Sequence, residues 1–428
     1  MKIKIYIIAA AALLFSQSAI AQDVDALGAY TPYSLYGIGE LANSSSATNR
    51  SMGGIGIGVR DKNFLNILNV ASITQRDTLS FMLNIGVVNK NSFLKDAGHS
   101  SGFNTFNINN LAMSFPIKNK FAMMVGLTPF SSMGYKFKSR EAESSLTARY
   151  GDIEYKKYGE GDINQIFFGV ALPIFKNLSV GVEGIYYFGT LNYHSDVYYN
   201  SAASIRTLLT GWKRKASGWS AEAGIQYSQP LHKDYVLTFG ATYRMRSTIK
   251  GSLMRYAYAK GDAITDTISQ SRMSNHVVIP NKFAVGVTLR KTDKWMFGVD
   301  YELQDWSNTK FMNTVGVSFV PQAAQSIRAG IEYTPNKYDV RYYLKRITYR
   351  AGFHYEQSYV KLNGSSINGF GVTFGMEFPI SRYNTTLNFS IDAGQRGRTK
   401  GYLIRERYIN ITVGLNLHDI WFIKRKYE

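Results

Sequence analysis

The stretch Ile409-Asn410-Ile411-Thr412-Val413-Gly414-Leu415-Asn416-Leu417 alternates apolar side chains with polar or small ones without a break. A period of two indicates a β-strand with one apolar face, because successive side chains of a strand point to opposite faces of its sheet. The same alternation recurs from residue 77 onward, with clear examples in 79–87, 235–243, 283–289, 295–303 and 370–378. The sequence therefore predicts an all-β protein.

The opposite faces of these runs carry glycines and charged residues. A soluble sandwich turns its charged face to water, whereas a transmembrane barrel turns its apolar face to lipid and its polar face to the lumen. Alternation alone does not separate the two. The many long strands, the 14% of aromatic residues and the missing covering helices favour a transmembrane antiparallel β-barrel. Its inward charges would be Glu183, Glu222, Arg244, Asp300, Glu302, Arg328, Glu332, Arg350, His354, Glu356, Glu377 and Asp392. We interpret them as pairs that hold the lumen closed.

Short polar connections, several of them after a proline, divide the barrel region into fourteen strands. An even number lets both ends of the barrel return to the same side of the membrane. Two further β-like runs, 145–158 and 203–215, are interpreted as loop hairpins or strand extensions, and sixteen strands is the alternative count. The expected strands are 77–90, 104–116, 120–137, 162–174, 178–197, 218–230, 235–250, 276–290, 294–306, 325–335, 347–360, 366–379, 383–396 and 404–418. Long loops are expected at 91–103, 138–161, 198–217, 251–275 and 307–324, with shorter Gly-rich ones at 361–365 and 397–403.

Residues 1–21 have the features of a secretory signal peptide. Lys2 and Lys4 precede the apolar run 5–15, and Ala19-Ile20-Ala21 offers a cleavage site. No cysteine occurs in the chain, which excludes disulfides, thiolate metal sites and a cysteine nucleophile. An exported chain with a barrel pattern predicts the outer membrane of a Gram-negative cell as its location.

Residues 22–75 lack the strand pattern and are rich in Gly, Ser, Asn and Ala. The stretch 50–59 is dense in glycine, but no Gly-Lys-Ser or Gly-Lys-Thr follows it, so it is not a nucleotide loop. Small residues allow a coil to pack tightly inside a lumen, and a fourteen-strand barrel has room for one. We therefore divide the chain into a signal peptide (1–21), an N-terminal plug or hatch (22–75) and a barrel (76–428), with a periplasmic tail as the alternative for 22–75.

The plug and the fourteen strands together resemble the long-chain fatty acid outer-membrane transporter family (FadL/TodX type). The family's plug motif runs from a Gly-Ala stretch to Asn-Pro-Ala. Here Ser51-Met52-Gly53-Gly54 leads to Leu68-Asn69-Val70-Ala71-Ser72, where Val70 replaces the proline. Leu127-Thr128-Pro129-Phe130 and Ile279-Pro280, followed by Phe283, Trp295 and Trp306, resemble further stretches of the family. The terminal segment 421–428 is similar to that of barrels from Bacteroidota, and we expect a divergent branch of the family there.

This resemblance implies passive uptake of a hydrophobic small molecule, such as a long-chain fatty acid, through a lumen gated by the plug. The residues along the ligand pathway would be Gly53, Gly54, Asn69 and Ala71 of the plug, with Pro129, Phe130 and Tyr135 of the third strand. Pro129 cannot donate a ladder hydrogen bond, so a kink or a gap in the wall is expected there.

The sequence offers little support for catalysis. The six histidines have no metal-binding spacing, and no Gly-x-Ser-x-Gly elbow occurs, so we expect no metal, no cofactor and no enzymatic activity. A barrel hydrolase would need a Ser–His pair at the inward His354. A polar network with Arg350 or Glu356 is the simpler expectation for that side chain.

The formal charge of +19 comes from 49 Lys+Arg against 30 Asp+Glu. Export argues against nucleic acid as the partner, so we expect membrane lipid and anionic lipopolysaccharide instead. The loop cations concerned are Lys136, Lys138, Arg140, Arg149, Lys156, Lys157, Arg206, Lys213, Arg214 and Lys215. Aromatic girdles at the lipid interface are expected from Tyr186, Tyr187, Trp219, Trp295 and Tyr301.

Two functions remain open from the sequence. Transport predicts an apolar pocket near Phe130 and the plug. The alternative is an accessory or scaffold subunit of a Bacteroidota outer-membrane secretion or barrel-assembly complex, with other outer-membrane proteins as partners. That alternative predicts a shut plug and a lumen filled with charges.

Overall fold

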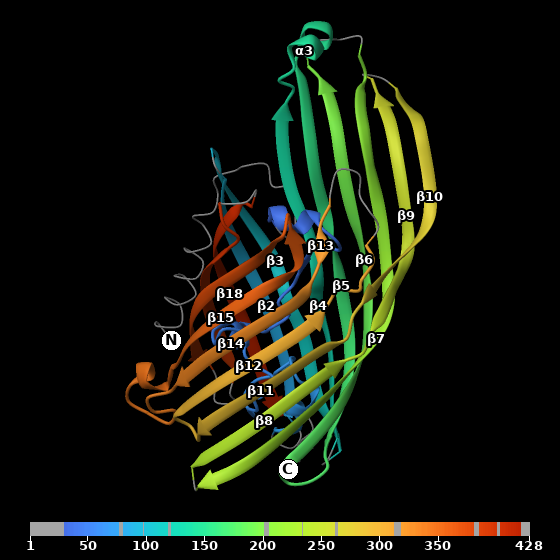
Figure 1. The fold of residues 1–428 in the computed structure, drawn as a ribbon. Helices are drawn as coiled ribbons and strands as arrows, with labels where there is room; N and C mark the ends of the chain where they lie inside the picture. The colour runs from blue at the N-terminus through green and yellow to red at the C-terminus, as the bar shows by residue number, and fades with distance from the viewer. Residues whose placement is uncertain are drawn as a thin grey trace, which may run out of the picture.

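The computed structural model describes residues 30–76, 80–96, 98–118, 121–200, 205–232, 234–261, 264–311, 318–380, 385–399 and 403–420. The predicted signal peptide lies outside these residues. The chain forms a closed antiparallel barrel in which β18 (Arg405–Ile420) pairs with β2 (Ser80–Lys95), so the last strand joins the first. The predicted fold class is confirmed, and Figure 1 shows the tilted strands surrounding the N-terminal segment.

Fourteen barrel strands follow from the pairing, as predicted. Three of them are interrupted: β8 continues as β9, β10 as β11, and β13 as β14. The bounds are β3 (Ser100–Lys118), β4 (Phe121–Arg140), β5 (Ile153–Pro173), β6 (Leu178–Tyr199), β7 (Thr207–His232), β8 (Tyr235–Arg244), β9 (Ser247–Lys260), β10 (Thr265–Ile279), β11 (Lys282–Lys291), β12 (Trp295–Asp305), β13 (Val320–Pro321), β14 (Ala323–Tyr333), β15 (Thr348–Leu362), β16 (Ser365–Pro379) and β17 (Thr386–Arg396).

The small elements lie outside the wall pattern. Before the barrel come η1 (Pro32–Leu35), β1 (Glu40–Leu41), α2 (Ala47–Arg50) and η2 (Val70–Thr74). Between barrel strands lie α3 (Ser144–Tyr150) and η3 (Tyr343–Arg346). Among the described residues, no helix is long and apolar enough to cross a membrane.

Six strands continue well beyond the rest of the barrel, and we call this part the six-strand extension. It comprises the distal parts of β4, β5, β6 and β7 together with β9 and β10, and it rises to the level of α3 (Figure 1). Residues 153–158 and 207–215 therefore belong to strand extensions, one of the two predicted possibilities, whereas 145–150 belong to α3. The prediction of a long loop at 251–275 is wrong, because β9 and β10 pair from Ser247↔Ile279 to Lys260↔Thr265.

The wall has a seam between β3 and β4. Their pairing runs from Lys118↔Phe121 to Leu111↔Leu127 and goes no further, while β4 continues with β5 on its other edge. The β4–β5 register shifts between Pro129 and Ser131, which makes Phe130 an extra residue. The irregularity expected at Pro129 is therefore present. Beyond it, β1 of the plug pairs with Ser131 and Ser132 of β4 and covers this edge.

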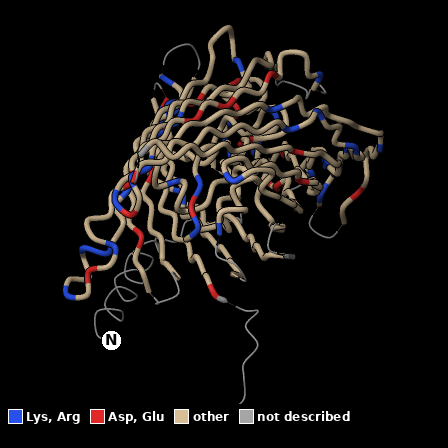
Figure 2. Tube along the Cα trace, turned by 90° about the horizontal axis from the view of Figure 1, so that it is seen from below, with Lys and Arg blue, Asp and Glu red and all other residues tan. Residues whose placement is uncertain are grey.

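The two faces of the wall differ as predicted. Large apolar side chains such as Phe297, Phe374 and Ile331 are exposed on the outside, and the twelve predicted inward charges are buried or half-buried. Figure 2 shows long uncharged stretches of strand between the charged positions. Tyr187 is a correction: it is fully buried and its hydroxyl accepts a hydrogen bond from Arg244 at 3.3 Å, so it faces the lumen and not the lipid girdle.

Candidate functional site: the plug in the barrel lumen

The plug, residues 30–76, fills the lumen of the barrel. Met52, Ile55 and Val59 are fully buried and form a small apolar core with Phe64 and Met296 of β12. The side chain of Asn66 donates to the carbonyls of Gly56 and Val59 at 2.6 and 2.9 Å, which holds the glycine-dense stretch in a folded loop. The plug is therefore an ordered unit and not a loose leader.

Glycines of the barrel wall let the plug backbone lie directly on the sheet. A Cβ on Gly330 would stand 2.5 Å from the carbonyl oxygen of Met52, and one on Gly286 would stand 2.8 Å from the nitrogen of Gly58. Gly352 and Gly240 would clash in the same way with Gly53 and Ile57. The inward glycines of the strands thus mark the surface on which the plug rests.

Polar side chains of the wall then fix the plug backbone. The Asp300 carboxylate accepts hydrogen bonds from the amides of Gly56 and Ile57 at 2.6 and 2.8 Å. The Thr373 hydroxyl accepts from the amide of Gly53 at 2.8 Å and lies 3.2 Å from the carbonyl of Ser51. Gln226 donates to the carbonyls of Ile57 and Val59. Strands β7, β12 and β16 thus hold the plug from three sides.

Ion pairs fill much of the remaining lumen, which confirms the predicted pairing of inward charges. Arg350 lies 2.8 Å from both Glu332 and Glu377, and Arg244 lies 2.6 Å from Glu222. Arg290 connects the wall to the plug, at 2.8 Å from Asp61 and 3.2 Å from Glu332. Further pairs are Arg328 with Glu302 and Glu356, His354 with Asp392, and Arg396 with Glu40 of the plug. Such a network is costly to break, because removing one partner leaves a buried charge unpaired.

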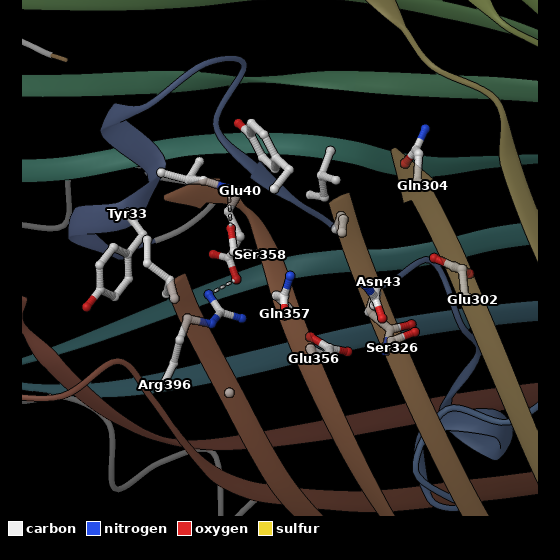
Figure 3. A pocket seen from close by; sticks show the side chains of 18 of the residues that line it. Tyr33, Glu40, Asn43, Glu302, Gln304, Ser326, Glu356, Gln357, Ser358 and Arg396 are labelled. Atoms are coloured by element: carbon white, nitrogen blue, oxygen red, sulfur yellow. Dashed lines mark hydrogen bonds and ion pairs between the residues drawn. The ribbon is translucent and has the colours of Figure 1, made fainter. Parts of the chain in front are cut away.

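The cavities described in the lumen are small, and their walls mix polar and apolar side chains. The cavity in Figure 3 has about 130 Å³ and is lined by Glu40, Glu302, Ser326, Glu356 and Arg396, among others; the Arg396–Glu40 pair crosses it. Two others have about 80 and 90 Å³. Pockets for small organic ligands typically have roughly 300–1,000 Å³ and are mainly apolar. Among the described residues, no group of three metal-ligating side chains is found.

The structure does not gather the predicted pathway residues into one place. Gly53 and Gly54 adopt φ values of +69° and +86° against β14 and β15. The Asn69 side chain donates to the carbonyls of Ile57 and Ile225, while Ala71 is fully buried at the start of η2 near β5, β6 and β7. These four residues shape and dock the plug.

The three predicted residues of β4 lie elsewhere. Phe130 packs on Tyr187 with ring centroids 4.7 Å apart and lines the 90 Å³ cavity. Pro129 lies at the bulge, and Tyr135 is buried against Tyr193 in the six-strand extension. The apolar pocket expected near Phe130 is not found among the described cavities.

The main anchors of the plug, Thr373, Gln226 and the wall glycines, were not predicted as site residues. Asp300 was predicted to face inward, but not to bind the plug. The sequence pattern that could have identified them is their inward position on strands in which glycine recurs. A glycine in a strand often marks the close approach of another backbone.

The fold and the lumen define a class: a closed fourteen-strand antiparallel β-barrel with an N-terminal plug in its lumen. Within this class the chain belongs to the BamG family, whose model matches residues 1–428. A comparison with curated proteins finds no match.

Solved structures share the fold at low sequence identity. The toluene transporter TbuX of Ralstonia pickettii has a TM-score of 0.57 and 15% identity, over 87% of this chain and 97% of that one. The toluene transporter TodX of Pseudomonas putida has a TM-score of 0.57 and 15% identity, over 89% and 99%. A FadL homologue of Pseudomonas aeruginosa has a TM-score of 0.53 and 11% identity, over 87% and 98%. The expected resemblance to FadL- and TodX-type barrels is thus confirmed for the fold.

Proposed function

We propose that this chain is a structural subunit of an outer-membrane assembly or secretion complex, and that its own lumen stays closed. The observation that carries this proposal is the plug: its backbone lies on wall glycines and is held by Asp300, Thr373 and Gln226, and the cavities described beside it are small. Because the lumen is packed in this way, we infer that the barrel acts through its outer surface.

The six-strand extension supplies such a surface. β10 pairs with β9 along one edge, and no described strand pairs with its other edge. Residues Thr265 to Ser274 of β10 are all exposed. An unpaired strand edge binds extended segments of other chains, because its free N–H and C=O groups continue the ladder. We further propose location in the outer membrane of a Gram-negative cell of the Bacteroidota, no enzymatic activity, and no nucleic-acid partner.

The test joins a partner measurement with a conductance measurement. Full-length protein is purified from its native membrane in mild detergent, as wild type and as the double variant Ile268→Lys/Met273→Lys, which places charges along the exposed β10. Ile264→Lys, on the exposed loop before β10, is the control. We expect a stoichiometric protein partner with wild type and control, its loss with the double variant, and no conductance of the wild type in planar bilayers. A conducting wild type, or no partner in any sample, would overturn the proposal.

A second candidate, the uptake of a hydrophobic small molecule gated by the plug, is favoured by the seam between β3 and β4. At this seam the wall is covered by β1 of the plug instead of a barrel strand, next to Phe130. A movement of β1 would open a lateral route, and the solved structures with this fold include toluene transporters. Mass spectrometry of the same preparations tests it: a hydrophobic molecule that is lost on Phe130→Ala, in a sample without partner, would support uptake.

A further inference from the structure

The largest apolar cavity among those described lies outside the barrel, on its lipid-facing wall. It has about 390 Å³ and is formed by β5, β6, β7, β8 and β11. Two neighbouring rows of paired residues build it. One row runs Val170, Val182, Ala223, Tyr243 and Phe283, and the other runs Leu172, Val180, Ile225 and Ala241. The alternate positions Gly181 and Gly224 face the plug, so both rows point to lipid.

The shape of this hollow follows from side-chain size. Ala223 stands between Val182 and Tyr243, and Ala241 is paired with Ile225. Small side chains between larger ones leave a trough whose sides are Val182, Tyr243 and Phe283, exposed by 65, 45 and 45%. A trough of this volume and polarity has the dimensions of a site for an apolar ligand, which the lumen lacks.

An aromatic girdle and a group of cations continue from the trough along the same face of β7. Trp219, four residues before Ala223, is 73% exposed and packs on Tyr186 at 4.7 Å between centroids. Four residues further, at roughly 3.3 Å per residue, stands Lys215, with Lys213 beyond it. Lys250 of β9 is exposed on the same face, paired with Ser217 between Lys215 and Trp219. None of the three lysines forms an ion pair with a described residue.

The side of the membrane follows from the connections. The six-strand extension lies at the end of the barrel opposite the short connections 119–120, 174–177, 233–234 and 292–294. In outer-membrane barrels, short turns face the periplasm. The lysines therefore stand at the cell surface, where the phosphates of lipopolysaccharide lie, and the trough stands beside its acyl chains.

We infer that this wall is a binding site for one lipid A moiety of lipopolysaccharide. Lys213, Lys215 and Lys250 bind the phosphates, Trp219 lies at the level of the glycosidic head group, and an acyl chain occupies the trough over Ala223 and Ala241. A row of cations alone would bind any anionic surface, and a trough alone would bind the acyl chain of any lipid. Their stacking along one strand face, with a girdle between them, selects a lipid that carries both phosphate and acyl chains.

The experiment measures binding of bis-phosphorylated, hexa-acylated lipid A and of its dephosphorylated form to full-length protein in detergent micelles, by native mass spectrometry. Two variants test the two parts of the proposed site. Lys213→Gln/Lys215→Gln/Lys250→Gln removes the cations, and Ala223→Phe fills the trough. The control is Lys157→Gln/Lys260→Gln, two exposed cations further along the extension: Lys157 is on β5, and Lys260 is at the far end of β9, ten residues beyond Lys250. The shift in gel mobility on heating shows that each variant forms a barrel.

We expect phosphorylated lipid A to bind wild type and control, and its affinity to fall roughly 100-fold in the triple lysine variant, at about fivefold per cation. Ala223→Phe is expected to weaken the binding of both forms of lipid A. Equal binding of the two forms by wild type, or full binding by either variant, would overturn the single-site proposal. Because no step depends on the lumen or on a partner protein, its failure would leave the proposed subunit function untouched.

Discussion

The plugged lumen and the six-strand extension are built from the same strands but are held together differently. In the lumen, polar groups hold the plug: Asp300 and Thr373 bind its backbone, and arginines pair with carboxylates around it. In the extension, aromatic packing dominates. Tyr193 and Trp212 stack with parallel rings 5.3 Å apart, and Tyr135 packs on Tyr193. The filled part of the molecule is therefore the membrane-spanning barrel, whereas the edge of β10 against which no described strand registers lies beyond it.

This difference follows from the surroundings. Within lipid, the outer face of each strand is already apolar, so the sheet can be closed and filled with polar groups that satisfy one another. Beyond lipid, water wets the outer face, and the sheet needs an apolar inner face to stay ordered. Substitutions in the lumen should therefore change conductance and leave the extension intact, and substitutions in the extension should leave conductance unchanged.

The largest effect is expected from Asp300→Ala, which removes the acceptor of two plug amides. A hydrogen bond to a charged group contributes about 1.5–3 kcal/mol, so plug docking should weaken by about 3 kcal/mol or more. We expect the variant to conduct ions in planar bilayers and its residues 31–76 to become sensitive to protease. Asp305→Ala, an exposed aspartate at the end of the same strand, is the control and should behave like wild type. An Asp300→Ala barrel that does not conduct ions and whose plug resists protease would contradict the role of Asp300 in holding the plug.

Gly352→Ala should give the next largest effect on the plug, because its Cβ would clash with the backbone of Met52 and Gly53. The plug has to shift or leave, at a cost of about 1–3 kcal/mol for overpacking. Gly184→Ala is a matched control, since its Cβ would point outward with its nearest neighbour 4.0 Å away. The rate of proteolysis within the plug measures the difference. Identical rates for the two variants would show that close contact with the wall does not hold the plug.

Much of this architecture could be predicted from the sequence, for a physical reason. Inside the membrane one face of every strand must be apolar, so alternation located the barrel strands within a few residues, as for 366–379 against β16. The rule fails at 251–275, where water replaces lipid and residues Thr265 to Ser274 are exposed whichever way they point. Alternation is then not required, and the pattern predicts a loop for 251–275, which holds most of β9 and β10.

The site was harder to predict than the fold. Glycines such as Gly352 and Gly286 indicated the close approach of another backbone, but not which segment approaches. That choice depends on long-range register, which places Asp300 opposite the amides of Gly56 and Ile57. Tyr187 was assigned to the lipid face from its neighbour Tyr186, although adjacent strand residues point to opposite faces, and only Tyr186 packs with Trp219.

A change in the extension should leave the lumen closed. Trp212→Ala removes a buried ring that packs on Tyr193, and loss of a buried aromatic side chain costs about 3–5 kcal/mol in a well-packed core. Because the extension opens locally, we expect faster hydrogen exchange in β7 and β9 above the girdle, with no change in conductance or plug proteolysis. Trp219→Ala, on the same strand but exposed to lipid, is the control. Increased plug proteolysis in Trp212→Ala would show that the two regions are coupled.

The smallest effect concerns pH in the extension. Burial lowers the pKa of His194 below 6.5, although Glu160 opposes the shift, and the Tyr256 hydroxyl lies 2.7 Å from Nδ1 of the ring. The folded extension therefore binds fewer protons than the opened one, so its stability is lost as pH falls from about 6.5 towards the lowered pKa. Burial raises the pKa of the neighbouring Asp196, which acts in the opposite sense.

Comparison with His194→Gln isolates the histidine from Asp196. Hydrogen exchange of β6 and β9, corrected for the intrinsic pH dependence of exchange, should accelerate severalfold between pH 7.5 and 5.5 in the wild type. The acceleration should be smaller in His194→Gln, while exchange in the plug should not respond to this substitution. The same acceleration in the wild type and in His194→Gln would show that protonation of His194 does not destabilise the extension. The stacking of His194 on Tyr158, with centroids 4.3 Å apart, would then have to tolerate the charged imidazolium.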